Sequence, residues 1–386
     1  MLKLSVVAIL AWATMAHGQA LDDKALLGKF IFFDKGLSQP TRQACADCHL
    51  PAAGWAIPEP GKAKDGPHPG AVQQASGARR PVPNAYITLN IPYNEAVPIG
   101  GALWDGRAEA ESGIIGDPAV AQAKLPFTNP VEMNLKDSVD LCQRIAAAKY
   151  ASLFEAVFGP ILCDNGGADQ VHDDVAEAIV AYESSHEVAQ FSSRYDDWAN
   201  GEGDLTPQEL EGLDLVAANC GCHGFDTSDP ETPFTTFLYF NVGVPKNVRN
   251  PVYKSDPGFV DLGLGGITGK PEHDGLFKVP SLRNVDKRPG KGFTKAFFHN
   301  GSVQSLEDVV RFYNARNAIG IVPEVADNVI NAEGSPGGIG NLGLDDAQVD
   351  AIVAFLQALS DRDRVSPPRI SDLKVDSKDS KKGNKE

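Results

Sequence analysis

The chain has 386 residues, which is enough for two domains of ordinary size, each with its own hydrophobic core. Its formal charge of −16 at pH 7 repels nucleic acid and anionic membrane surfaces, so the composition excludes both as partners. The same charge is compatible with a basic protein partner.

The N-terminus has the pattern of an export signal. Lys3 precedes an apolar run at 4–15, and residues 18–20 (Gly-Gln-Ala) have the small side chains of a signal-peptidase site. We expect residues 1–20 to be a signal peptide, so that the mature protein starts at Leu21 and is periplasmic. A membrane anchor is the weaker alternative, because the run is shorter than the roughly 20 apolar residues that a bilayer requires. No other segment qualifies as a membrane span.

The first motif, C-x-x-C-H, contains Cys45, Cys48 and His49. In this pattern two thiols add to the porphyrin vinyl groups of haem, and the adjacent imidazole binds the iron. Zinc is the alternative, but a zinc site would need a second pair of ligands. A short apolar helical or turn-like segment, 26–33, leads into the motif. Residues 51–98 follow it and are dense in Pro, Gly and Ala, so we expect a long irregular stretch packed around a haem.

Two helical patterns follow, at residues 138–158 and 173–195, and the second has apolar side chains recurring on one face. Residues 200–204 (Asn-Gly-Glu-Gly-Asp) have the composition of a linker. Thr206 then caps a third helix, with a proline at its first position and Glu209 as the capping-box partner.

This third helix runs into a second, imperfect haem motif, Cys220-Gly221-Cys222-His223. His223 is the expected iron ligand, and Cys222 keeps the standard adjacency to it. Cys220 is one residue too close, and Asn219 stands at the usual position of the first cysteine. We therefore predict a second c-type haem that is attached through Cys222 by a single thioether.

Four of the six cysteines belong to the haem motifs, which leaves Cys142 and Cys163 as a pair. Because export allows oxidation of thiols, we predict a disulfide between them, with two buried free thiols as the alternative. The last helix is expected at 345–359. The segment 361–386 is rich in Lys, Asp and Ser, and we expect a disordered tail there. The predicted fold is mostly α, with two tandem cytochrome-c-like haem domains (21–200 and 201–360) and long irregular loops.

Several short blocks resemble the bacterial di-haem cytochrome c peroxidase and MauG family, and they occur in the family order over nearly the whole mature chain. The blocks are the segment 27–38 that leads to the first haem motif, 104–108 (Trp-Asp-Gly-Arg-Ala), 129–133 (Asn-Pro-Val-Glu-Met), 277–285 (Phe-Lys-Val-Pro-Ser-Leu-Arg-Asn-Val) and 298–301 (Phe-His-Asn-Gly). The resemblance implies two c-type haems, of which the N-terminal one meets hydrogen peroxide.

The resemblance also implies how open the first haem is. Some peroxidases of the family block the face opposite the proximal ligand with a second histidine. The corresponding segment here, 71–81, contains none, and the nearest histidine is His68. We therefore expect an open, five-coordinate haem next to His49, as in MauG-like enzymes, which needs no reductive activation. His68 as a ligand is the rival, and a solvent-facing loop histidine ranks above that rival.

Glu111, seven residues beyond Trp104, is matched to the family's distal acid, which would move a proton between the two oxygen atoms of peroxide. Glu109 is its neighbouring competitor, and either carboxylate could instead be a solvated helix charge. Arg107 is expected to steady the pocket or a haem propionate, with a structural ion pair as an equal alternative. Trp104 is matched to the family's indole between the two haems, where it would relay electrons rather than only fill the core.

The remaining ligand of the second haem follows from the methionines. The mature chain contains one, Met133, in its N-terminal half, so a methionine ligand at the second iron is disfavoured. The position where relatives place that methionine is Tyr313, as in MauG-like enzymes. A phenolate oxygen stabilises ferric iron and lowers its potential. A core tyrosine on a helix at 305–314 is the less favoured alternative.

The family also places a calcium ion between the haems. Thr294 matches part of that site, but Pro81 and Ala296 replace the Asn and Pro of the family pattern. The resemblance therefore leaves calcium as an open expectation.

Together these matches imply an enzyme that uses hydrogen peroxide to oxidise a partner protein by long-range electron transfer, as MauG-like proteins do. The alternative is a cytochrome c peroxidase that reduces hydrogen peroxide to water with electrons from a small cytochrome or copper protein. A third reading is a non-enzymatic electron carrier in which both irons have six ligands.

Overall fold

The computed structural model describes residues 20–56, 67–73, 75–164, 166–227, 229–330, 338–362 and 364–373. The predicted signal peptide, apart from Ala20, lies outside these residues. Within them the chain is mostly helical, as predicted, with a single small antiparallel sheet in which β1 (Tyr239–Phe240) pairs with β2 (Phe277–Lys278). None of the described helices combines the length and the apolar character needed to cross a membrane.

The helices are short and are separated by long irregular stretches, as the Pro- and Gly-rich composition indicates. In chain order the α-helices are α1 Asp23–Phe32, α2 Cys45–Cys48, α3 Ala108–Ser112, α4 Pro118–Lys124, α5 Ser138–Ala146, α6 Ala151–Phe158, α7 Gly167–Glu183, α8 Arg194–Ala199, α9 Pro207–Asn219, α10 Val252–Ser255, α11 Gly265–Thr268, α12 Leu306–Ala315 and α13 Asp346–Ala358. Short 3₁₀ turns are η1 Lys35–Leu37, η2 Pro51–Ala53, η4 Ile87–Leu89, η5 Leu125–Phe127, η6 Gly221–His223, η7 Pro271–His273 and η8 Ile370–Asp372.

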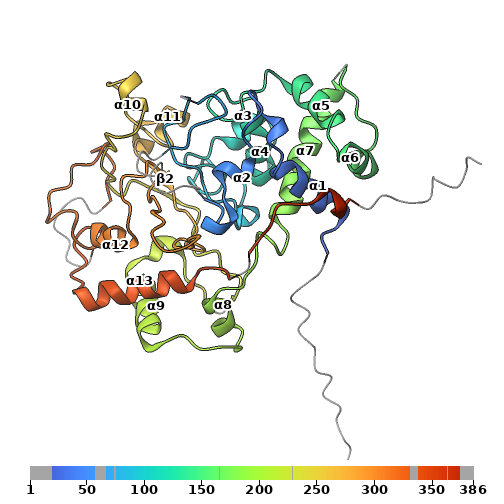
Figure 1. The fold of residues 1–386 in the computed structure, drawn as a ribbon. Helices are drawn as coiled ribbons and strands as arrows, with labels where there is room; N and C mark the ends of the chain where they lie inside the picture. The colour runs from blue at the N-terminus through green and yellow to red at the C-terminus, as the bar shows by residue number, and fades with distance from the viewer. Residues whose placement is uncertain are drawn as a thin grey trace, which may run out of the picture.

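The N-terminal half is built on α7, against which α1, α4 and α5 pack (Figure 1). The crossing of α1 and α7 is close enough to require a glycine. A methyl group at Gly28 would lie 1.8 Å from the carbonyl oxygen of Ala178. One apolar cluster, whose buried members run from Leu27 to Val188, forms the core of this half.

The C-terminal half uses the same device. Here α9 packs across α13 (Figure 1), and a methyl group at Gly212 would lie 2.0 Å from the carbonyl oxygen of Ala351. The predicted start of α9 is confirmed, since Thr206 and Glu209 form a reciprocal capping box. A second apolar cluster, with buried members from Tyr195 to Leu359, lies in this half.

The helix predicted over 138–158 is interrupted, so that it forms α5 and α6. Tyr150 lies at the break, where its buried ring packs near Phe30 and its hydroxyl donates to Asp34 (2.7 Å). This contact joins segments far apart in the chain, and therefore local periodicity does not reveal it.

The helix predicted over 173–195 is also wrong at both ends, because α7 starts and stops earlier. At its end the hydroxyls of Ser184 and Ser185 donate to the carbonyl oxygens of Val180 and Tyr182 (2.7 and 2.6 Å). The same two carbonyls also accept from the backbone N–H groups of Ser184 and Ser185, so the serine hydroxyls reinforce the last turn at the point where the helix ends.

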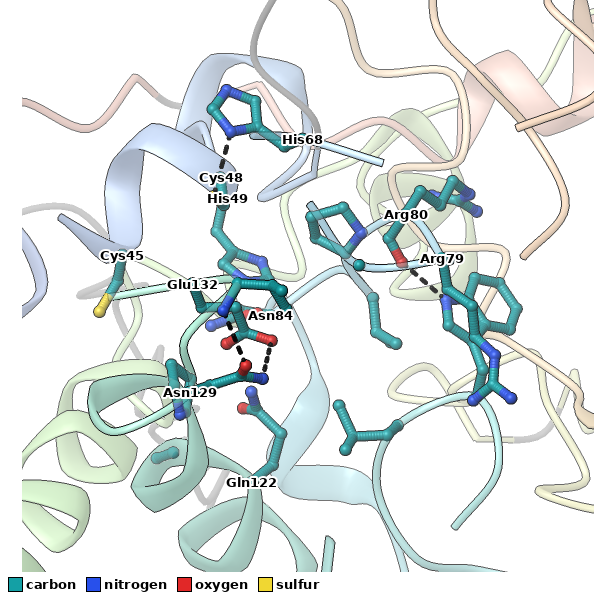
Figure 2. A pocket seen from close by; sticks show the side chains of 18 of the residues that line it. Cys45, Cys48, His49, His68, Arg79, Arg80, Asn84, Gln122, Asn129 and Glu132 are labelled. Atoms are coloured by element: carbon teal, nitrogen blue, oxygen red, sulfur yellow. Dashed lines mark hydrogen bonds between the residues drawn. The ribbon is translucent and has the colours of Figure 1, made fainter. Parts of the chain in front are cut away.

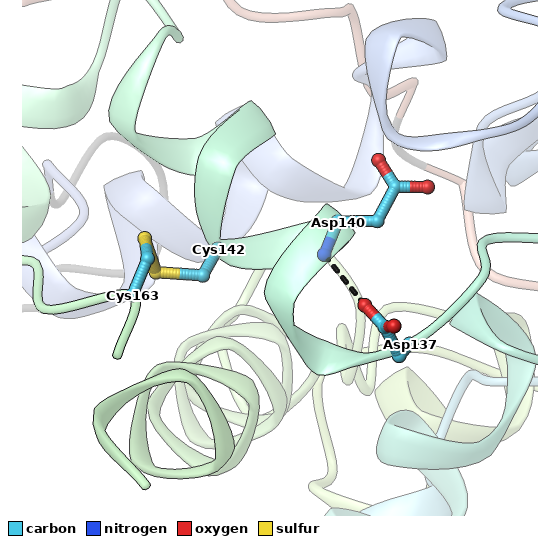
Figure 3. Close-up of a disulfide and its surroundings, with 4 residues drawn as sticks. All are labelled: Asp137, Asp140, Cys142 and Cys163. Carbon is cyan, nitrogen blue, oxygen red and sulfur yellow. Dashed lines mark hydrogen bonds between the residues drawn. A yellow bond between two sulfur atoms is a disulfide. The ribbon is translucent and has the colours of Figure 1, made fainter. Parts of the chain in front are cut away.

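The predicted disulfide is confirmed: Cys142 of α5 is bonded to Cys163 in the loop before α7 (Figure 3). The two Cα atoms lie 5.6 Å apart. The bond joins α5 to the chain that follows α6, at the periphery of the N-terminal half.

The expected disordered tail differs from the structure as far as residue 373. Asp361 is buried and accepts a hydrogen bond from the hydroxyl of Tyr86 (2.8 Å), while Val365 and Leu373 pack against the N-terminal cluster. The polar composition of the segment hid these few anchors. Residues 374–386 lie outside the described part of the chain.

Candidate functional site

The first haem motif forms α2 and borders a cavity of about 380 Å³ (Figure 2). The carboxylate of Asp47 accepts a hydrogen bond from the Ala44 N–H (2.8 Å) and thereby fixes the start of this short turn. Cys45, Cys48 and His49 all line the cavity. The sequence motif therefore brings two thiols and one imidazole to a common space.

The two thiols of the motif are shielded from water. Burial raises the pKa of the Cys45 thiol, and it raises the pKa of Cys48 to about 12. In the part of the chain that the structure describes, no cluster of three or more His, Cys, Asp or Glu side chains could hold a metal ion.

His49 is held in one tautomer. Its Nδ1 donates to the carbonyl oxygen of Trp55 (3.2 Å), because a carbonyl can only accept. Burial lowers the pKa of His49 to about 4, so the ring is neutral near pH 7 and carries its lone pair on Nε2. A histidine held this way is prepared to bind a metal through Nε2.

The second motif repeats this arrangement at a smaller cavity of about 170 Å³. His223 lines it and donates from Nδ1 to the carbonyl oxygen of Phe234 (3.1 Å), and burial lowers its pKa to about 4. Cys220 and Cys222 both line the cavity, and so does Asn219. The irregular spacing thus still delivers two thiols to the same space.

Tyr313 reaches the second cavity from α12, on a segment remote in sequence from the second motif. Burial raises the pKa of its hydroxyl, and the neighbouring Cys220 and Cys222 raise it further. Met133, by contrast, lines the first cavity. The structure therefore brings Tyr313 and His223 to one cavity and leaves the methionine in the other.

Trp104 lines both cavities. Its Nε1 donates to the carbonyl oxygen of Arg80 (2.9 Å), and the Arg80 guanidinium lies 5.0 Å from the centre of its ring. The backbone oxygen of Trp104 accepts from the N–H of Lys278 in β2 (2.9 Å). The His299 ring is stacked on Phe277, with ring centres 3.6 Å apart, and makes an edge-to-face contact with Trp104, with ring centres 6.4 Å apart. The indole is therefore buried between the two candidate haem sites.

Glu111 does not lie where the matched distal acid was expected. Its side chain is 52% exposed, does not line the cavity, and pairs with Arg107 Nε one helical turn earlier (3.3 Å). Glu109, the competitor, is buried, but its carboxylate accepts from the backbone N–H groups of Tyr93 and Gly116 (2.8 and 3.0 Å). Glu109 thus stabilises loops, and Glu111 is a surface charge.

Glu132 is the carboxylate that sequence analysis missed. It lines the first cavity with Gln122, and Asn129 Nδ2 donates to its Oε1 (3.0 Å; Figure 2). Burial is the main reason that the pKa of Glu132 is raised, and the charge of Arg107 partly opposes the rise. A signal was present, because Glu132 belongs to the family-like block 129–133.

Arg107 lies at the first cavity and also forms ion pairs. It lines the first cavity and also pairs with Asp105 (2.8 Å), which in turn pairs with Arg79. His68 lies beside Cys48, with Nδ1 3.5 Å from that sulfur and 2.7 Å from the carbonyl oxygen of Pro69 (Figure 2). His68 therefore lines the cavity next to the Cys48 thiol.

Comparison with known proteins gives a consistent set of similarities. The sequence profile of the di-haem cytochrome c peroxidase family matches residues 22–204. The methylamine utilization protein MauG of Paracoccus denitrificans (strain Pd 1222) is 35% identical over 393 residues, which cover 94% of this chain and 96% of that protein. Cytochrome c551 peroxidase of Nitrosomonas europaea is 28% identical over 297 residues, covering 75% and 72%.

Two solved structures extend the similarity to three dimensions. The di-haem peroxidase BthA from Burkholderia thailandensis E264 is 30% identical with a TM-score of 0.73, covering 88% of this chain and 86% of that one. A MauG-like protein associated with microbial copper homeostasis is 26% identical with a TM-score of 0.66, covering 91% and 93%.

Proposed function

The chain belongs to the family of di-haem cytochrome c peroxidases that includes MauG, and we propose that it is a MauG-like enzyme, which uses hydrogen peroxide to oxidise a partner protein at long range. One observation carries the proposal: two cavities, each lined by a haem motif, share the wall formed by Trp104, and the second cavity is also lined by Tyr313. This arrangement suits two redox centres that act together.

The donor atoms fit two c-type haems in the two halves of the chain, which we take as domains 21–200 and 201–360. The residues that would hold them are Cys45, Cys48 and His49 for the first, and Cys222, His223 and Tyr313 for the second. When bound, haem supplies the redox chemistry with peroxide, and the protein supplies ligation, placement and proton handling.

Glu132 is proposed as the group that handles the proton of peroxide, in place of Glu111. Its carboxylate would take the proton from one oxygen of hydrogen peroxide and return it to the leaving oxygen. Its raised pKa brings it nearer to neutral pH, which suits a group that both accepts and donates. Gln122 and Arg107 would orient the peroxide from the same cavity.

The size and lining of the first cavity support the proposal of an open haem site there. The first cavity has more than twice the volume of the second (about 380 against 170 Å³). Glu132 and Gln122 line the first cavity, whereas His68 lies beside Cys48. We therefore propose that the first haem keeps one face open and that His68 is not its ligand.

The second centre distinguishes the two enzymatic candidates. A detoxifying peroxidase needs a second haem that is easily reduced, and an anionic oxygen ligand opposes reduction. Tyr313 at the second cavity and Met133 at the first therefore favour oxidation of a partner protein. A small cytochrome or copper protein as electron donor is the alternative partner. The disulfide and the predicted export signal support a periplasmic location.

The test begins with the intact mature holoprotein. Its mass should correspond to the polypeptide with two haems. If Cys222 alone forms the thioether of the second haem, the mass of a Cys220→Ser variant should also correspond to two bound haems. A ferric spectrum with a high-spin component is expected from the open first site. Peroxide should then be consumed without added reduced cytochrome c when a protein substrate is present. Turnover that depends strictly on reduced cytochrome c would support the alternative enzyme.

A further inference from the structure

Lys295 is a buried cation that is surrounded by backbone carbonyls. Its side chain is 6% exposed, and Nζ donates to the carbonyl oxygens of Ala53 (3.0 Å), Asn284 (2.8 Å) and Lys287 (3.2 Å). Three acceptors match the three hydrogens of an ammonium group. Burial and then the charge of Arg80 lower the pKa of Lys295 to about 7, but only the protonated form fills this cage.

Arg80 is a second buried cation in the same region. Arg80 is 8% exposed, and its side-chain Nε donates to the carbonyl oxygen of Phe298 (2.6 Å). Its backbone N–H donates to the carbonyl oxygen of His299 (2.8 Å). Within the described residues neither Arg80 nor Lys295 has a carboxylate at ion-pair distance; three carbonyl oxygens surround the Lys295 ammonium group, and one accepts from the Arg80 side chain.

The two cations cross-link the two halves in opposite directions. Arg80 belongs to the N-terminal half and binds carbonyls of the C-terminal half, whereas Lys295 belongs to the C-terminal half and binds Ala53, just after the first haem motif. Buried polar groups of this kind are costly unless every partner is present. The bonds from Lys295 to Ala53 and from Arg80 to Phe298 therefore tie the two halves together where they meet.

The calcium ion expected from the family does not fit this environment. Calcium takes six to eight oxygen ligands, commonly with carboxylate or amide side chains among them. Position 81 is a proline without a side-chain oxygen, and Lys295 stands directly between the matched positions Thr294 and Ala296. A divalent ion there would be repelled by the two buried positive charges of Lys295 and Arg80.

We propose that Lys295, supported by Arg80, joins the two halves in place of the calcium ion that the family pattern implies, so that this protein does not require calcium. The three carbonyl oxygens accept hydrogen bonds from the ammonium group, and carbonyl oxygens of this kind are also common ligands in the coordination shell of a metal ion. The inference concerns the contact between the halves and goes beyond the proposed peroxide chemistry.

The first test uses the unaltered holoprotein. It is dialysed against calcium and then passed through a desalting column, and its calcium content, melting temperature and ferric electron paramagnetic resonance spectrum are measured before and after treatment with EGTA. We expect no retained calcium and no change on chelation. Stoichiometric calcium, or a shift of the melting temperature or spectrum with EGTA, would overturn the proposal.

The second test removes the charge. Lys295→Met keeps the length and apolar stem but removes the three hydrogen bonds of the ammonium group, and it should lower the melting temperature of the holoprotein, whereas Lys291→Met at an exposed position should not. Equal melting temperatures for the two variants would contradict the role of the cage. Should the Lys295 variant fail to fold, the chelation experiment still decides. A failure of the proposed enzymatic function would appear in peroxide consumption and leave the calcium content untouched.

Discussion

Replacing Arg80 with glutamine should make Trp104 easier to oxidise. The guanidinium lies 5.0 Å from the centre of the indole ring, and both side chains are buried. A positive charge at this distance opposes an indole radical cation by about 3 kcal/mol at an effective dielectric constant of about 20. If electron transfer between the two sites passes through Trp104, loss of the charge should accelerate it by on the order of a hundredfold.

The assay is stopped-flow mixing of the ferric holoprotein with one equivalent of peroxide, followed by reduced cytochrome c, with the rate of cytochrome oxidation as readout. Arg80→Lys is the matched control, because it keeps the positive charge while changing the hydrogen bonds. The glutamine variant should be fast and the lysine variant close to the original protein.

Trp104→Phe provides the second control. In that background Arg80→Gln should have no accelerating effect, because the oxidisable ring has been removed. Equal rates for the glutamine and lysine variants, or the same acceleration without the indole, would refute the electrostatic reasoning. The loss of the cation–π contact should also reduce stability by about 1 kcal/mol, which a denaturant titration measures separately.

Four further changes have directions set by the structure. Tyr313→Phe should raise the midpoint potential of the second haem and change its ferric spectrum, and an unchanged redox titration would exclude the phenol as a ligand. Glu132→Gln should slow the reaction with peroxide by about 10²- to 10⁴-fold; in the original protein this rate should fall as pH drops through the raised pKa of Glu132, because the carboxylate must accept a proton. Replacing both Cys142 and Cys163 with serine should cost about 3 kcal/mol of unfolding free energy for a loop of this length, measured by guanidinium titration. Glu183, whose pKa burial raises from 4.5 to about 8, binds its proton more tightly when folded, so stability should fall as pH rises from about 4.5 to about 8, and Glu183→Gln should remove this slope in thermal scans across pH.

The predictions of helix starts depended on interactions between residues that are close in the sequence. The capping box at Thr206 and the caps at Ser305 and Asp345 are short-range signals, and the helices that follow them begin as expected. At the break between α5 and α6, Tyr150 contacts Asp34, which lies in a distant segment of the chain. No periodic pattern encodes such a contact, so the single long helix was predicted wrongly.

The candidate site shows the same division. The haem motifs deliver their own side chains to the cavities, because each motif is a single local turn. The distal acid was assigned by its nearness in sequence to Trp104, but α3 points Glu111 to solvent, while the turn at Asn129 returns Glu132 to the cavity. Spatial neighbours created by a returning chain require either the structure or the complete family pattern.

The two hydrogen bonds that hold Trp104 link the position of its indole ring to the folding of both halves. Its indole N–H is anchored to the segment at Arg80, and its carbonyl is anchored to β2 in the other half of the molecule. The indole therefore reaches its place between the two cavities only when both halves are folded against each other, because one anchor comes from each half.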